Sequence, residues 1–145
     1  MECTTGGRLA PRDHRLQVST DVDFRAAGWP ADLLARLDAG GAVVVRLPGR
    51  GVPYPPLLRA IADAGRVRRI GRPSRWGNPW PLPAGADHGA RADVIARYRA
   101  HLLSRPDLMD QLPTLAGCAL GCRCWPLPCH GDVLAELVAA LPGAA

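Results

Sequence analysis

The sequence predicts an α/β fold with a small, mainly parallel sheet flanked by helices, in a single domain with an N-terminal extension. Stretches with apolar residues at helical spacing alternate with short β-branched runs. This alternation favours parallel strands, because each strand is followed by a helix that returns the chain to the same edge. The 145 residues are enough for one domain with its own hydrophobic core.

The predicted elements of the first half of the chain form an extension at 21–65. Before it, residues 1–20 show no periodic pattern and many polar residues, so we expect a mobile arm. A helix is predicted at 30–41, where a proline precedes leucines on one face and two glycines follow them. The valine-rich run 42–47 predicts a buried strand, and the apolar spacing at 56–64 predicts a second helix.

The core domain is predicted at 66–145. It begins with a strand at 66–70, which leads into an irregular segment at 71–89 that is rich in proline and glycine. A loop of this length in a small domain is usually either functional or disordered, and its two tryptophans favour order. Apolar spacing and β-branched residues predict the remaining elements: helices at 92–103, 106–112 and 131–141, and a strand at 114–124.

Arginine supplies all 18 basic residues of the chain, which has a formal net charge of +5 and no lysine. The absence of lysine excludes Schiff-base and pyridoxal mechanisms and the Walker A phosphate loop. Guanidinium groups are planar, permanently charged forks that suit phosphate and carboxylate ligands. A GC-rich genome would produce the same excess of arginine, so the position of each arginine is more informative than their number.

The expected compartment is the cytoplasm, with no membrane partner. No apolar stretch approaches the ~18 residues of a membrane span, and the first ten residues lack the apolar centre of a signal peptide. Four of the five cysteines fall within 118–129. This clustering favours reduced thiols with a local chemical task over a disulfide framework.

The arginine–tryptophan segment, residues 66–80, contains five arginines and two tryptophans. Guanidinium forks bind phosphate, and indole faces stack on bases. The segment predicts a site for a nucleotide or another anionic small molecule, or for single-stranded nucleic acid. The alternative is a solvated edge strand followed by a loop that core tryptophans hold. The candidate binding residues are Arg69, Arg72, Ser74, Arg75, Trp76, Asn78 and Trp80.

The cysteine–histidine segment, residues 122–132, reads CRCWPLPCHGD and supports a metal hypothesis. Three cysteines and one histidine form a plausible Cys3His set for tetrahedral zinc or part of an iron–sulfur shell. The spacing differs from the paired C-x2-C knuckles of common zinc modules. The candidate metal ligands are Cys122, Cys124, Cys129 and His130.

The same segment supports a nucleophile hypothesis. A cysteine at a helix N-terminus has a depressed pKa, and His130 would act as a general acid or base. Asp132 would either orient His130 or cap the helix. A third interpretation is that small buried thiols simply pack in the core. The candidate catalytic residues are Cys124, Cys129, His130 and Asp132.

The two segments together resemble a family known as a bacterial and phage domain of unknown function, number 4326. The resemblance spans 67–141 and implies that both segments belong to one site. The occurrence of relatives in phages implies nucleotide or nucleic-acid metabolism by association. The matching residues are Ile70–Ser74, Trp76–Pro79, Tyr98, Leu120–Cys122, Cys124 and Pro128–Leu134.

The sequence therefore predicts a small enzyme that acts on a nucleotide, nucleoside or modified base by hydrolytic or transfer chemistry. The alternative is a non-enzymatic nucleic-acid-binding module with a structural Cys3His zinc site. A redox or metal-sensing protein is a third hypothesis. The sequence does not identify a cofactor, and zinc is the candidate that the metal hypothesis offers. Both predicted segments follow strands, so we expect them to face one another across a crevice, where parallel sheets bind ligands.

Overall fold

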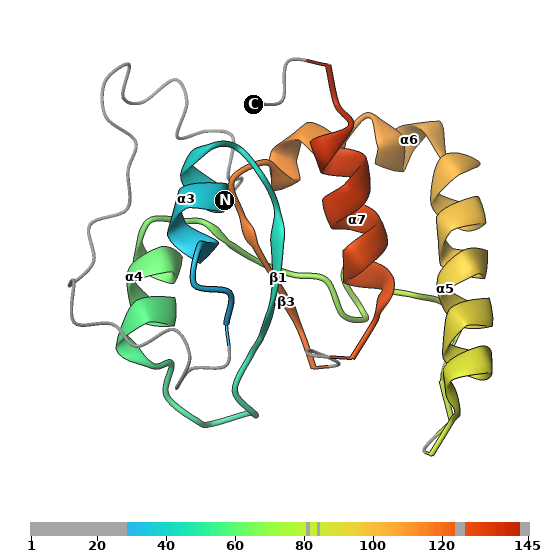
Figure 1. Cartoon of the computed structure of the whole chain (residues 1–145), viewed down its shortest axis with the longest axis horizontal. Coiled ribbons are helices and arrows are strands. Elements are labelled where there is room, and N and C mark those ends of the chain that lie inside the picture. The colour runs from blue at the N-terminus through green and yellow to red at the C-terminus, as the bar shows by residue number, and fades with distance from the viewer. Residues whose placement is uncertain (1–28, 81, 84, 124–126, 143–145) are drawn as a thin grey trace.

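The described part of the chain forms one three-stranded parallel sheet with helices on both faces (Figure 1). The structure is a computed structural model, and it describes residues 29–80, 82–83, 85–123 and 127–142. The arm predicted at 1–20 lies outside the described residues. The predicted α/β class with a small parallel sheet is confirmed.

The sheet has the strand order β1-β3-β2, so the strand that comes last in the sequence lies in the middle. The strands are β1 (Val43–Arg46), β2 (Val67–Arg69) and β3 (Ala119–Cys122). In the register, Leu120 of β3 lies opposite Val44 on one side and Arg68 on the other. The segment that the sequence sets apart as an extension thus contributes β1 to the same sheet as the core domain.

Helices cover the sheet in two layers (Figure 1). On one face, α3 (Leu33–Asp38) and α4 (Pro56–Asp63) bury their leucines against β1. On the other face lies α7 (His130–Ala139), and α5 (His88–Leu103) packs on the far side of α7. Two short elements, α6 (Pro106–Met109) and the 3₁₀ helix η1 (Leu112–Leu115), connect α5 to β3.

The alternation of side chains along each strand determines which residues meet the α7 layer. Val43 and Val45 pack with the α3 and α4 core, whereas Val44 packs on the opposite face. Leu120 and Cys122 of β3 belong to the same core cluster as Val44. The sheet therefore presents the Cys122 side chain on the face that α7 covers.

The strand predicted at 114–124 is wrong over its first part, because β3 covers only Ala119–Cys122. Before β3 the chain forms η1 and then a turn at Gly117, whose φ of 75° is accessible mainly to glycine. The Gly117 N–H donates to the carbonyl oxygens of Gly40 and Gly41, 3.1 and 3.0 Å away. This contact fixes the point at which the strand begins.

The helix predicted at 92–103 begins four residues earlier, at His88. The Asp87 carboxylate accepts a hydrogen bond from the Ala90 N–H at 2.8 Å and caps the helix there. Within the part of the chain that the structure describes, no helix is long and apolar enough to cross a bilayer.

Candidate functional site

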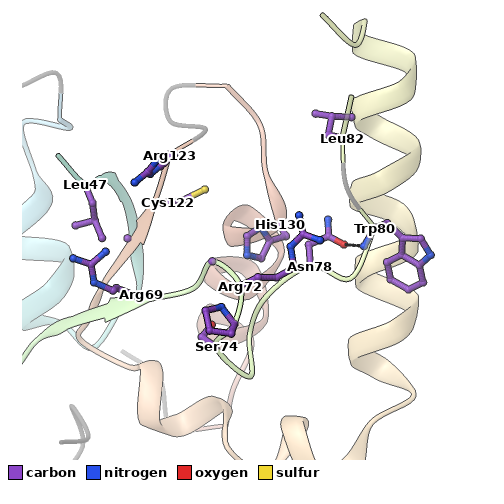
Figure 2. A pocket seen from close by; sticks show the side chains of 13 residues that line it. Leu47, Arg69, Arg72, Ser74, Asn78, Trp80, Leu82, Cys122, Arg123 and His130 are labelled. Atoms are coloured by element: carbon purple, nitrogen blue, oxygen red, sulfur yellow. Dashed lines mark hydrogen bonds between the residues drawn. The ribbon is translucent and has the colours of Figure 1, made fainter. Parts of the chain in front are cut away.

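A cavity of about 840 Å³ lies at the carboxyl edge of the sheet (Figure 2). Its wall includes residues at the ends of all three strands, namely Leu47 after β1, Arg69 in β2 and Cys122 in β3. His130, the first residue of α7, completes this wall. Because the strands are parallel, their carboxyl ends meet at one edge, which is where open α/β sheets usually bind ligands.

The cavity brings together the arginine–tryptophan segment and the cysteine–histidine segment. Figure 2 shows Cys122 and His130 between Arg69 and Arg123 on one side and Trp80 and Leu82 on the other. The lining residues from the arginine–tryptophan segment are Arg69, Gly71, Arg72, Pro73, Ser74, Asn78 and Trp80.

Two candidate binding residues do not line the cavity. Trp76 is only 5% exposed, and its carbonyl oxygen accepts a hydrogen bond from the Tyr98 hydroxyl at 2.8 Å. The indole therefore packs in the core and does not line the cavity, where the predicted stacking on a base would take place. Arg75 is exposed outside the cavity lining.

The charge of the described cavity wall is uniformly positive. Three arginines line it, Arg69, Arg72 and Arg123, and none of the described lining residues is acidic. Arg69 is oriented by a hydrogen bond from its guanidinium to the Tyr54 hydroxyl at 3.0 Å. Arg123 is not among the binding residues predicted from the sequence, although its place directly after Cys122 was a usable signal. This wall would attract an anionic ligand.

The loop that supplies Arg72 is folded tightly on itself. The N–H of Ser74 donates to the Gly71 carbonyl at 2.9 Å, and the N–H of Gly77 donates to the Ser74 carbonyl at 3.0 Å. Further along, the Asn78 Oδ1 accepts a hydrogen bond from the Trp80 N–H at 2.9 Å (Figure 2). These bonds give the arginine–tryptophan segment a defined shape.

Trp80 is half-buried at the end of the cavity nearest α5. Its indole packs at right angles to the imidazole of His101, with ring centroids 5.5 Å apart. This contact comes from α5, which the sequence alone does not place beside the loop. It holds the indole in one orientation at the rim of the cavity.

Replacing Gly77 with alanine is expected to destabilise this loop. A Cβ at position 77 would lie 2.8 Å from the Cγ and 3.0 Å from the Cα of Arg72. The Cα belongs to the backbone and cannot move away cheaply, so we expect the free energy of unfolding to fall by about 1–3 kcal/mol. Chemical denaturation of the purified chain measures this change.

Gly71→Ala is the matched control for stability. A Cβ at position 71 would meet no atom within 4 Å, and neither Gly71 nor Gly77 has a positive φ. We expect the free energy of unfolding of Gly71→Ala to stay within about 0.5 kcal/mol of that of the parent chain. Equal effects of the two substitutions would contradict the close approach of Gly77 to Arg72.

The cysteine–histidine segment folds back so that three of its candidate ligands lie together. One ligand atom from each of Cys122, Cys129 and His130 lies within 4.8 Å of the other two, and all three residues are buried. Cys122 comes from the end of β3, Cys129 caps α7, and His130 begins that helix. Cys124, the fourth candidate ligand and a candidate catalytic residue, lies outside the described residues.

The His130 ring has a defined hydrogen-bonding role. Its Nε2 lies 2.7 Å from the carbonyl oxygen of Ile70. A carbonyl oxygen only accepts hydrogen bonds, so Nε2 holds the proton and donates it, and the Nδ1 of a neutral ring keeps its lone pair. Tyr98 packs edge-on against the same ring, with centroids 4.9 Å apart.

Asp132 caps the helix and so fulfils one of the two roles that the sequence allows. Its Oδ2 accepts a hydrogen bond from the Cys129 N–H at 3.0 Å, and the Asp132 side chain is otherwise exposed. In return, the Cys129 Sγ accepts a hydrogen bond from the Gly131 N–H at 3.3 Å. Asp132 therefore positions Cys129 at the start of α7.

The surroundings of Cys129 do not produce the depressed thiol pKa that the nucleophile hypothesis requires. The pKa of Cys129 is raised, first by its hydrogen bond with Cys122, then by burial and then by the charge of Cys122. The Gly131 N–H acts in the opposite direction. The effect of the neighbouring Cys122 thiol on the pKa of Cys129 is therefore larger than the opposite effect of the helix N-terminus. The position of Cys129 at the helix N-terminus does not by itself reveal this thiol.

The prediction of reduced thiols holds for part of the cysteine cluster. Neither Cys122 nor Cys129 forms a disulfide bond. Cys118 is disulfide-bonded, which contradicts the prediction at that position. Cys118 is not a member of the group of ligand atoms formed by Cys122, Cys129 and His130.

Comparison with known proteins agrees with the placement of both segments in one unit. A family model described as a domain of unknown function (DUF4326) matches residues 60–140. Over 73 residues, the chain is 36% identical to the "Uncharacterized 12.4 kDa protein in nrdA-td intergenic region" of Enterobacteria phage T4. This match covers 48% of the chain and 64% of the phage protein. No solved structure matches the chain. Since the family model covers more than half of the chain, including both segments of the cavity, the protein belongs to the DUF4326 family.

Proposed function

We propose that the protein is an enzyme that acts on a nucleotide, nucleoside or modified base by hydrolytic or transfer chemistry. The observation that supports this most strongly is the shared cavity. A positively charged loop and a buried cysteine–histidine group, distant in the sequence, line the same space. Anion-binding side chains next to groups capable of chemistry are what such an enzyme requires.

The size of the cavity favours a small molecule over a nucleic-acid strand. Its volume of about 840 Å³ lies within the range of roughly 300–1,000 Å³ that is typical of small-molecule sites. A single strand instead follows an extended positive groove with successive stacking surfaces. A phosphorylated ligand with one base matches the cavity better than a strand does.

The side chains of the cavity suggest how such a ligand lies. Arg72 and Arg123 form no ion pair with any described residue, and both line the cavity, so they would bind the phosphate. Trp80 and Leu82 provide apolar surface for a base on the side of the cavity away from Arg123. The ligand would then extend past the wall that Cys122 and His130 form.

We expect Arg72→Ala to weaken the binding of nucleotides about 10- to 100-fold, because a charge-assisted contact to phosphate contributes roughly 1.5–3 kcal/mol. Isothermal titration of the full chain with nucleoside mono- and diphosphates measures the dissociation constants. The affinity for nucleosides, which carry no phosphate, should change far less in this variant.

Arg75→Ala is the matched control, because it removes the same charge from the same loop outside the cavity lining. We expect it to leave nucleotide affinity within about twofold, since exposed charges act weakly through water and salt. Equal weakening by both substitutions, or no binding of any nucleotide, would refute the proposed role of the cavity. Tighter binding of a short single-stranded oligonucleotide than of any nucleotide would favour a nucleic-acid-binding module.

A further inference from the structure

We propose that Cys122, Cys129 and His130 bind a zinc ion at the wall of the cavity. This inference deepens the proposed function, on which it rests only for the ion's role in chemistry. The metal site itself is argued from the three side chains and their surroundings.

The three ligand atoms are already close to the geometry of a zinc site. They lie within 4.8 Å of one another. Around tetrahedral zinc, with Zn–S near 2.3 Å and Zn–N near 2.0 Å, ligand atoms are separated by about 3.5–3.8 Å. From 4.8 Å, the ligand atoms would have to approach one another by at most about 1.3 Å to complete the site.

The surroundings of His130 are those of a metal ligand. Its Nε2 donates to the Ile70 carbonyl at 2.7 Å, and the ring is buried against Tyr98. A metal-binding histidine almost always donates its second ring N–H to a carbonyl or carboxylate, which fixes the tautomer and the orientation of the ring. The remaining nitrogen, Nδ1, is then the atom that would bind the ion.

The two thiols are also held in place by bonds outside the group of ligands. The Cys129 Sγ accepts the Gly131 N–H, and the Asp132 carboxylate accepts the Cys129 N–H. On the other side, the Arg91 guanidinium donates to the Pro128 carbonyl at 2.9 Å and ties the residue before Cys129 to α5. Cys122 is fixed by its place in the central strand. Such outer contacts favour a preformed site.

The chemistry of the ligands selects the metal. Two thiolates and one imidazole are soft ligands that favour zinc over magnesium or calcium, which prefer oxygen. Zinc sites with three protein ligands keep a fourth position for water or substrate. Cys122 and His130 line the cavity, so this position would face it. When bound, the ion supplies a Lewis acid at the point where the proposed ligand passes.

The test begins with the full-length chain, stripped with a chelator and reloaded with zinc. We expect stoichiometric zinc by elemental analysis. In competition with a chromophoric chelator, Cys122→Ser, Cys129→Ser and His130→Asn should each weaken zinc binding by more than about 100-fold, since even outer contacts of zinc sites are worth roughly 10- to 100-fold. The matched control is His88→Ala, which removes an exposed histidine at the start of α5 and should leave zinc binding unchanged.

Cobalt substitution gives a readout that does not depend on the recovery of the variants. The parent chain loaded with Co²⁺ should show a thiolate-to-cobalt charge-transfer band, and azide should shift the cobalt d–d bands if the fourth position faces the cavity. A chain that takes up no zinc, or whose zinc affinity is unaffected by the three ligand substitutions, overturns the metal site. Bound cobalt that does not respond to azide overturns its placement at the cavity wall.

Failure of this inference differs from failure of the proposed function. Zinc binding with no nucleotide binding leaves the metal site standing and removes the nucleotide enzyme. If the chain binds nucleotides but no zinc, and Arg72→Ala weakens nucleotide binding, the proposed function stands and the metal site is removed. The two sets of measurements use different ligands and different variants, so each result is assigned to one proposal.

Discussion

Replacing Tyr98 with alanine is expected to lower the free energy of unfolding by about 3–5 kcal/mol, the range for truncating a large buried aromatic side chain. Tyr98 is fully buried at the centre of α5. Its ring packs against His130, and its hydroxyl donates to the Trp76 carbonyl. One side chain thus supports both segments that form the cavity. Denaturation with urea measures the loss.

Tyr98→Phe separates the hydrogen bond from the packing of the ring. It removes the hydroxyl that donates to the buried Trp76 carbonyl at 2.8 Å. We therefore expect the free energy of unfolding to fall by about 1–3 kcal/mol. The control is Tyr54→Phe, where the hydroxyl meets the Arg69 guanidinium at the surface, and the loss should stay below about 1 kcal/mol. If Tyr98→Phe were as stable as the parent, the bond to Trp76 would not be holding the loop.

The second large effect is expected at Arg66. Its guanidinium donates to the Gly117 carbonyl at 2.9 Å and the Leu37 carbonyl at 2.7 Å, and it pairs with Asp38 at 3.1 Å. It thereby joins the end of α3 to the turn before β3. Because the side chain is only 15% exposed, we expect Arg66→Met to lower the free energy of unfolding by about 2–4 kcal/mol.

Arg36→Met provides the comparison for Arg66. Arg36 forms an exposed pair with Asp32 at 4.0 Å, one helical turn away. Pairs of this kind contribute about 0.3–0.5 kcal/mol, so the two methionine variants should differ several-fold in their effect on stability. Similar midpoints of urea denaturation for the two variants would show that the Arg66 contacts do not bear on stability.

The elements of the fold could be predicted from the sequence because their signals are local. Leucines one turn apart indicate α3 and α4, and consecutive valines indicate β1. The order of the strands could not be predicted, because three parallel strands can be arranged in several ways and nothing in β3 alone marks it as central. The structural role of Arg66 could not be predicted either, because it depends on carbonyl groups 29 and 51 residues away.

The candidate site could be predicted only in part, because its local motifs are visible in the sequence but its contacts between distant elements are not. Trp76 and Trp80 occur in one loop with similar neighbours, yet one is buried and the other lines the cavity. The difference arises from α5, whose Tyr98 binds the backbone of Trp76 and whose His101 packs against Trp80. Likewise, the approach of Cys122 to Cys129 depends on the docking of α7 against β3, a contact that residue spacing alone does not reveal.

The central position of β3 affects how the sheet can form while the chain is being synthesised on the ribosome. β1 and β2 each pair only with β3 in the described sheet, so neither finds a partner strand until residues 119–122 have been synthesised. More than seventy residues separate β1 from β3, so the backbone groups of the valine-rich β1 have no partner strand in this sheet while those residues are synthesised. Unpaired strand edges of this kind are prone to aggregation until their partner strand is available. The described sheet, and with it the cavity at its edge, can therefore form only after β3 has been synthesised.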